Sequence, residues 1–164
     1  HALELYDNYV DAHNNLGVTY RKKGMLHEAI QEYQRALQLN PRYPYAHNNL
    51  GVLYAKSGLV DLAIDAFRNA IAHKPDYADA HNNLGTYYIK KGFYEKAIDE
   101  CLKAIRFNNR YKDAYYNLSA AYFNHKQYDK ALDASKRVLS MERNHPGAHE
   151  IINLILGQKG PAEK

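Results

Sequence analysis

The chain has 164 residues, 46% of them hydrophobic and 24% charged, and its formal net charge is +4. This balance is typical of an ordered chain with an apolar core and excludes intrinsic disorder. No apolar run approaches the roughly 18 to 20 residues of a membrane span, and the single cysteine, Cys101, excludes an internal disulfide framework. Because no signal peptide is visible at its start, the sequence favours a cytoplasmic protein.

An internal repeat organises the sequence. The letters HNNLG occur at residues 13–17, 47–51 and 81–85, each copy 34 residues after the one before. At this period the chain aligns without gaps in four lines, residues 10–43, 44–77, 78–111 and 112–145. Periods of this length indicate stacked helical units that share a continuous core.

The elements follow in chain order. Residues 1–9 (HALELYDNY) match the close of a line, RALQLNPRY at 35–43, so we interpret them as the end of a preceding, truncated repeat. Within each line, positions such as His13, Leu16, Gly17 and Tyr20 predict one buried stripe of a first helix. A glycine column then predicts a turn, and a second apolar stripe predicts a second helix. In the first line that helix ends at Asn40-Pro41.

The last line departs from this pattern. Ser119, Lys126, Ser135 and Val138 replace the glycine, glycine, aromatic and alanine that occupy these columns in most other lines, so this repeat is expected to pack less tightly. Residues 146–156 predict a first helix that acts as a C-terminal cap, and residues 157–164 predict a polar tail.

These columns resemble the tetratricopeptide repeat, a helix–turn–helix unit of 34 residues marked by an aromatic-x2-Leu-Gly-x2-Tyr segment followed by Ala, Phe, Ala and Pro. The resemblance covers residues 10–145 as four repeats, although His13, His47 and His81 occupy the column of the family's usual tryptophan. It implies an all-α fold, a right-handed α-α superhelix or solenoid. It also implies a non-catalytic protein–protein interaction scaffold without cofactors.

The face of each first helix opposite its buried stripe contains the candidate binding residues. In this family the first helices line the concave groove, so the resemblance implies that these positions bind a peptide. Helical spacing places Asp, Asn and Lys on this face. The candidate positions are Asp11, Asn15, Lys22, Tyr45, Asn49, Lys56, Asp79, Asn83, Lys90, Asp113, Tyr116 and Asn117.

The asparagine row, which comprises Asn15, Asn49, Asn83 and Asn117, has two interpretations. An amide offers two donors and an acceptor, which suits hydrogen bonding to the backbone of an extended peptide. A similar row lies in the groove of the O-linked N-acetylglucosamine transferase repeats and by resemblance suggests the same use. Alternatively, the amides bond to neighbouring helices and keep the array in register.

The candidate positions indicate only in part what kind of partner would bind. The mixture of Lys and Asp suggests a partner with some acidic residues, and Tyr45 and Tyr116 could anchor a side chain. The carboxylate clamp that holds chaperone C-termini is not matched. Its places fall on Asn14, Val18, Asn49, Asp79 and Asn83, of which only Asn49 fits. Open repeat ends would allow self-association.

Other classes of function find little support. His13, His47 and His81 lie one repeat apart, too far for a single metal ion, and Cys101 occupies an aromatic column that predicts burial. RNA binding is an alternative, since pentatricopeptide arrays are similar in build, but the basic residues form no stripe. A second alternative is the substrate-targeting segment of a larger enzyme such as a glycosyltransferase.

Overall fold

The computed structural model describes the backbone of residues 2–158 and the side chains of residues 9–157. These residues form helices joined by short turns, with no strand among them. The expected tail at 157–164 lies almost wholly outside the described residues. The chain divides into two compact units, residues 1–80 and residues 81–164.

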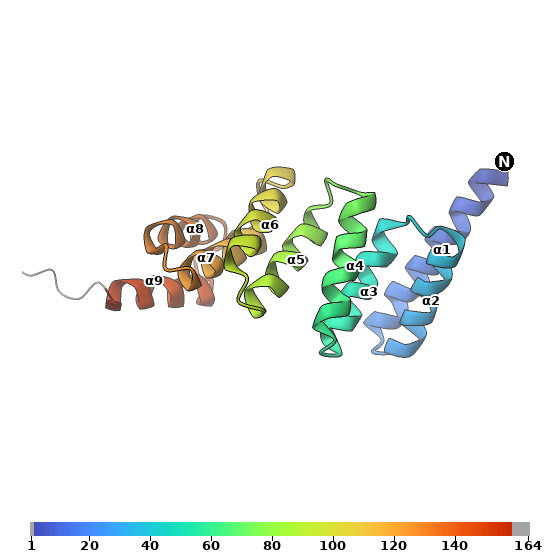
Figure 1. Cartoon of the computed structure of the whole chain (residues 1–164), viewed down its shortest axis with the longest axis horizontal. Helices are drawn as coiled ribbons and strands as arrows, with labels where there is room; N and C mark the ends of the chain where they lie inside the picture. The colour runs from blue at the N-terminus through green and yellow to red at the C-terminus, as the bar shows by residue number, and fades with distance from the viewer. Residues whose placement is uncertain (1, 159–164) are drawn as a thin grey trace, which may run out of the picture. The chain divides into compact units, whose positions relative to one another are not determined.

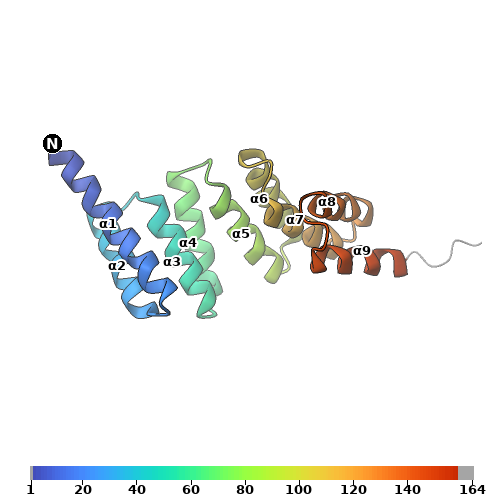
Figure 2. The same cartoon turned by 180° about the vertical axis from the view of Figure 1, so that it is seen from behind.

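Helical hairpins build both units (Figures 1 and 2). The helices of the first unit are α1 (Ala2–Lys22), α2 (Leu26–Leu39), α3 (Pro44–Lys56) and α4 (Val60–His73). Helix α5 (Ala78–Lys90) begins in the first unit and lies mostly in the second. The rest of the second unit consists of α6 (Tyr94–Phe107), α7 (Lys112–Asn124), α8 (Tyr128–Met141) and α9 (Pro146–Gln158). Odd-numbered helices up to α7 are the expected first helices, and even-numbered ones are the second.

Helix α1 is longer than the sequence pattern suggests. It continues unbroken from Ala2 to Lys22, so no turn separates residues 2–9 from the repeat that follows. At the equivalent place in the next repeat, Asn40 and Pro41 interrupt the chain between α2 and α3. Tyr6 and Asp7 occupy these positions before the first repeat. The missing proline alone does not account for the unbroken helix, because Asn109 and Arg143 occupy the same position where the chain turns after α6 and α8.

The turn inside each repeat is a Schellman motif. Four of the residues that the structure describes adopt a positive φ: Gly24 (78°), Gly58 (76°), Gly92 (77°) and Lys126 (61°). After each of them the next N–H bonds back to the carbonyl five residues earlier, as Met25 N does to Tyr20 O at 3.0 Å and Gln127 N does to Tyr122 O at 2.9 Å. The glycine column therefore marks the turns as predicted, and the fourth repeat makes the same turn with a lysine.

Small residues on first helices face large ones on second helices. A Cβ atom added at Gly17 would lie 2.6 Å from the Tyr33 ring, and one at Gly51 would lie 2.6 Å from the Phe67 ring. In the last repeat the pair is Ser119 and Ser135, whose hydroxyl oxygens are 2.6 Å apart. Both serines are fully buried. The expectation that this repeat packs less tightly stays a prediction.

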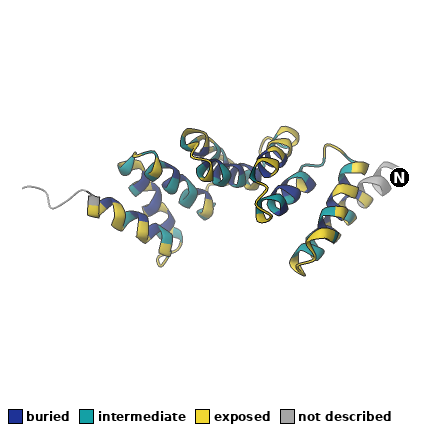
Figure 3. Ribbon diagram, turned by 60° about the horizontal axis from the view of Figure 1, so that its bottom comes forward, coloured by how far each residue is buried: buried dark blue, intermediate teal, exposed yellow. Residues whose placement is uncertain are grey.

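Buried residues concentrate on the faces that the helices turn toward each other (Figure 3). Ala29, Tyr33 and Ala36 of α2 form one core cluster with Leu50 and Leu53 of α3. The prediction that Leu16 is buried is wrong. Leu16 is 41% exposed, whereas its equivalent Leu50 is 5% exposed. Leu50 packs against the second helix of the preceding repeat, and no described helix precedes α1 to cover Leu16 in the same way.

Candidate functional site

The candidate site is the first-helix face, which we define as the residues predicted above on the first helices opposite their buried stripes. In the first unit Asp11, Asn15, Lys22 and Lys56 are exposed, and Asn49 is half-buried. Tyr45 is 37% exposed. Asp79, at the end of this unit, is also exposed. The predicted residues therefore lie outside the core of their repeats.

In the first unit the asparagines connect neighbouring first helices. Asn49 of α3 donates a hydrogen bond to Oδ1 of Asn14 of α1 at 2.9 Å. Asn14 is only 7% exposed and so is buried. The first asparagine of HNNLG was not predicted as part of this network. It recurs in three of the four lines, at Asn14, Asn48 and Asn82, and Tyr116 takes its place in the last.

The second unit repeats this bond and adds to it. Asn117 of α7 donates to Oδ1 of Asn82 at 2.8 Å and to Oγ1 of Thr86 at 2.9 Å. Asn82 is buried and donates in turn to the Tyr111 hydroxyl at 3.4 Å. An amide that donates twice keeps only its oxygen as an acceptor. The donors of Asn49 and Asn117 therefore bond to neighbouring first helices, as the second interpretation of the row expects.

Tyr45 belongs to a cluster of aromatic residues in the first unit. Its ring lies edge-on to those of Tyr43 and Tyr77, with centroids 5.3 Å apart in both cases. The Lys74 amine donates to the Tyr45 hydroxyl at 2.7 Å, and this bond raises the pKa of Lys74. The Tyr43 hydroxyl donates to Asp11, and burial raises the pKa of Tyr77 to about 12. The cluster holds Tyr45 in a fixed position on the face.

Tyr116 has less freedom than its spacing suggested. Its ring lies 4.9 Å from the His145 ring, and a Cβ atom added at Gly147 would come within 2.5 Å of its hydroxyl. Tyr116 therefore packs against the start of α9. In the same unit Lys90 is exposed, with its amine 4.5 Å from the centre of the Tyr87 ring, and Asp113 is exposed.

The histidines connect helices within repeats. His13 Nδ1 lies 2.6 Å from the Glu32 carboxylate, and His81 Nδ1 lies at the same distance from Glu100. In the second repeat Ala66 occupies the place of these glutamates, and His47 bonds instead to the Pro41 carbonyl at 2.9 Å. Among the described residues no three His, Cys, Asp or Glu side chains gather in a way that could hold a metal ion.

Cys101 is fully buried, as predicted, and its Sγ atom occupies the space beside Gly85. Burial, followed by the charge of Glu100, raises the pKa of its thiol to about 12. The thiolate is the reactive form of cysteine, and so little of it forms near neutral pH. None of the described helices is both long enough and apolar enough to cross a membrane.

Comparison with known proteins identifies the family. Three family models match the sequence, one described as "TPR repeat" at residues 19–58 and two described as "Tetratricopeptide repeat" at residues 48–111 and at residues 1–31 and 100–133. A solved structure, "Crystal structure of MamA", is 30% identical over 88% of this chain and 84% of that chain, with a TM-score of 0.81. The chain belongs to the tetratricopeptide repeat family. Its fold is the all-α repeat solenoid that the sequence pattern predicts.

Other tetratricopeptide repeat (TPR) structures share this fold. PilF of Pseudomonas aeruginosa is 25% identical, with a TM-score of 0.84 over 94% of this chain and 70% of that chain. YrrB, whose structure is described as "a TPR protein with an unusual peptide-binding site", is 21% identical, with a TM-score of 0.82 over 99% of this chain and 84% of that chain. At that level of identity the likeness to YrrB shows the fold alone. A search of curated proteins with the sequence of this chain gives no significant match.

Proposed function

We propose that this chain is a non-catalytic protein-interaction scaffold that binds an extended segment of a partner protein on the first-helix face. TPR structures described with a peptide-binding site or with a bound HSP90 peptide support the general role. The proposal for this chain depends on its own amides. Each amide in the row provides an acceptor at a position that packing inside the repeat does not require.

The observation that carries the proposal is the unused oxygen of two asparagines. Asn49 and Asn117 donate within the array, but no described side chain or backbone group donates to the Oδ1 atom of either residue. Both residues are partly exposed, so a partner can reach them. A backbone N–H group is the donor that every non-proline residue of an extended peptide supplies. The row therefore orders the array with its donors and binds the partner with its acceptors.

The remaining residues of the face define what else the partner would meet. Asp11 lies midway along α1 and Asp79 lies in the first turn of α5, whereas Lys22, Lys56 and Lys90 lie in last turns. Tyr45 adds an aromatic surface, and Asn15, Asn83, Asp113 and Tyr116 complete the face. A partner segment with both acidic and basic side chains satisfies this distribution of charge.

The test separates the two uses of the amides. Short random-sequence peptides are selected on the intact chain, and the affinity of the best peptide is measured by fluorescence anisotropy. The double variant Asn49→Ala/Asn117→Ala removes the free acceptors together with the array bonds. We expect each lost bond to weaken binding by a few-fold to about tenfold, since a hydrogen bond contributes about 0.5–1.5 kcal/mol net.

The matched control is Asn14→Ala/Asn82→Ala, which removes the Asn49–Asn14 and Asn117–Asn82 bonds from the other side. It also removes the bond from Asn82 to Tyr111, and it leaves the acceptors and the Asn117–Thr86 bond in place. It should lower the melting temperature at least as much, yet bind the peptide within about twofold of the parent. Equal losses of affinity in both double variants would limit the asparagines to ordering the array. Selection of no peptide, with tight binding of single-stranded RNA instead, would favour the RNA-binding alternative.

A further inference from the structure

A second surface lies in the unit of residues 81–164, away from the first-helix face. Two adjoining cavities of about 280 and 240 Å³ share Tyr122 and Lys130 and form one trough. Its floor is the side of α7 that carries Tyr115, Leu118 and Tyr122, and one wall is α8. None of the residues of the first-helix face lines it. We call this surface the α7–α8 trough.

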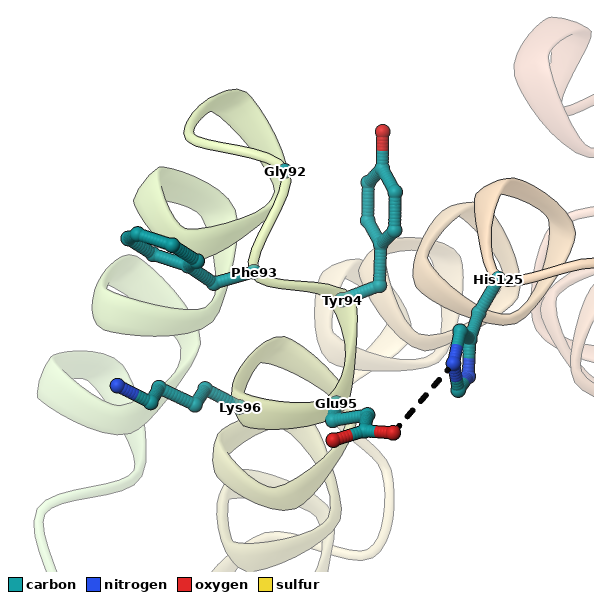
Figure 4. Close-up of a pocket in the computed structure, with 6 residues that line it drawn as sticks. All are labelled: Gly92, Phe93, Tyr94, Glu95, Lys96 and His125. Atoms are coloured by element: carbon teal, nitrogen blue, oxygen red, sulfur yellow. Dashed lines mark ion pairs between the residues drawn. The ribbon is translucent and has the colours of Figure 1, made fainter.

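The other side of the trough comes from α6. Glu95 and Ile98 line the smaller cavity together with His125 from the turn after α7. Figure 4 shows Glu95 and His125 pointing toward one another at this end, and their side chains lie 3.6 Å apart. Ile98 also packs on the core cluster of Cys101, Leu118 and Ala134. The floor is thus continuous with the hydrophobic core beneath it.

Two cations project from α8 along this floor. The Lys130 amine lies 5.5 Å from the centre of the Tyr122 ring, and the Arg137 guanidinium lies 5.8 Å from the centre of the Tyr115 ring. Both residues are exposed, and neither forms an ion pair with a described carboxylate. Because both side chains are exposed, an anion from solution can reach them. The trough therefore carries these two cations together with two carboxylates, those of Glu95 and Asp133.

One acidic residue stands between the cations. Asp133 of α8 lines the larger cavity with Lys130 and Arg137, and Ala134 lies beside it. These four positions follow i, i+3, i+4 and i+7, so they share one face of the helix. Along this wall the positive Lys130 comes first, the negative Asp133 and the small apolar Ala134 follow, and the positive Arg137 comes last. A partner with a continuous run of acidic residues would be repelled at the centre.

We propose that the α7–α8 trough binds an acidic protein segment in which two carboxylates are separated by two uncharged residues. Lys130 and Arg137 are seven residues apart, which is about 10.5 Å along a helix. Acidic residues three apart in a polyproline II segment project on the same side, about 9.3 Å apart. The carboxylates pair with the two cations, and an apolar side chain between them contacts Tyr115, Leu118 and Ala134.

The probe for this proposal is a labelled synthetic peptide with two glutamates separated by a leucine and an alanine. A shuffled peptide with adjacent glutamates has the same composition, and a third peptide carries lysines in their place. Fluorescence anisotropy on the intact chain should give the tightest binding for the first peptide. Asp133→Asn should tighten binding of the shuffled peptide several-fold, because its central carboxylates then meet no opposing charge.

Lys130→Glu/Arg137→Glu should weaken binding of the first peptide at least tenfold. The control Lys136→Glu/Arg143→Glu changes net charge equally at exposed positions outside the trough and should remain within twofold. All four positions are exposed, and circular dichroism melting checks that both variants fold. Equal losses in both double variants, or equal binding of all three peptides, would overturn the proposal. So would single-stranded RNA that binds more tightly and depends on Lys130 and Arg137.

Discussion

Lys126 occupies a turn position where the other three repeats have glycine, and its backbone keeps the same positive φ. The three other turns use glycine at φ values of 76° to 78°, whereas Lys126 adopts 61° with a full side chain. The hydrogen bonds of the turn are the same, since Gln127 N reaches Tyr122 O and Lys126 N reaches Phe123 O, both at 2.9 Å. The geometry of the turn therefore comes from the repeat, and the lysine adopts a conformation that suits glycine better.

Lys126→Gly should stabilise the chain by about 1 kcal/mol, because the strain of a left-handed residue with a Cβ atom disappears. Urea unfolding followed by circular dichroism measures the change. Gly58→Lys places the same strain in the second repeat, where a Cβ atom would meet nothing within 4 Å, and should destabilise by a similar amount. If both variants left the midpoint of unfolding unchanged, the backbone conformation at these turns would carry no measurable strain.

Helix pairs depend on contacts between a small residue and a large one. Gly17 faces Tyr33, Gly51 faces Phe67, and Gly85 faces Cys101 and the Ala97 carbonyl. Ser119 differs, since it donates to the Ala131 carbonyl at 2.9 Å and bonds to Ser135. A larger first-helix residue thus accompanies a smaller second-helix residue. The two columns act as one interface, although the sequence presents them sixteen residues apart.

Gly51→Ala should destabilise the chain by about 1 kcal/mol or more. The new methyl group would lie 2.6 Å from the buried Phe67 ring, and overpacking costs roughly 1–3 kcal/mol, which outweighs the gain in helix propensity. Gly157→Ala is the control, since a Cβ atom there meets nothing within 4 Å and helix propensity alone acts. Its melting temperature should stay equal or rise slightly. If both variants changed the melting temperature equally, the contact with Phe67 would not explain the effect of Gly51→Ala.

At the scale of the whole molecule, periodicity determined what could be predicted. The Leu, Gly and Ala columns predicted paired helices, and the structure has them, because each column is a contact that every repeat makes. Leu16 failed because its burial depends on a neighbouring repeat and not on its own helix. The sequence did not predict that Asn14 and Asn82 accept hydrogen bonds, for the same reason: the donors, Asn49 and Asn117, belong to the next repeat. The α7–α8 trough was not predicted, because the contacts of its two cations with Tyr122 and Tyr115 depend on how α7 and α8 pack against each other.

The melting temperature of the whole chain should fall at acidic pH because of one carboxyl group, that of Glu100, which bonds to His81. Burial raises the pKa of Glu100, but hydrogen bonds from His81 and Lys103 outweigh it, so the pKa lies below its usual 4.5. A carboxyl whose pKa is lower in the folded state stabilises the fold above its unfolded pKa and loses that contribution as pH falls. Lys103 also bonds Asp99 at 2.6 Å, so its ammonium group is shared between two carboxylates.

Glu100→Gln isolates this contribution. Above about pH 4.5 the parent chain should melt at a higher temperature than the variant, and the difference should shrink as pH falls through the folded pKa of Glu100. Glu142→Gln is the matched control, because Glu142 also has a lowered pKa but bonds Lys112 at an exposed position. Solvent screens such a pair, so its difference should be small at every pH. A constant gap between the parent and Glu100→Gln down to about pH 3 would mean that Glu100 stabilises the helix pair by packing and not by its charge.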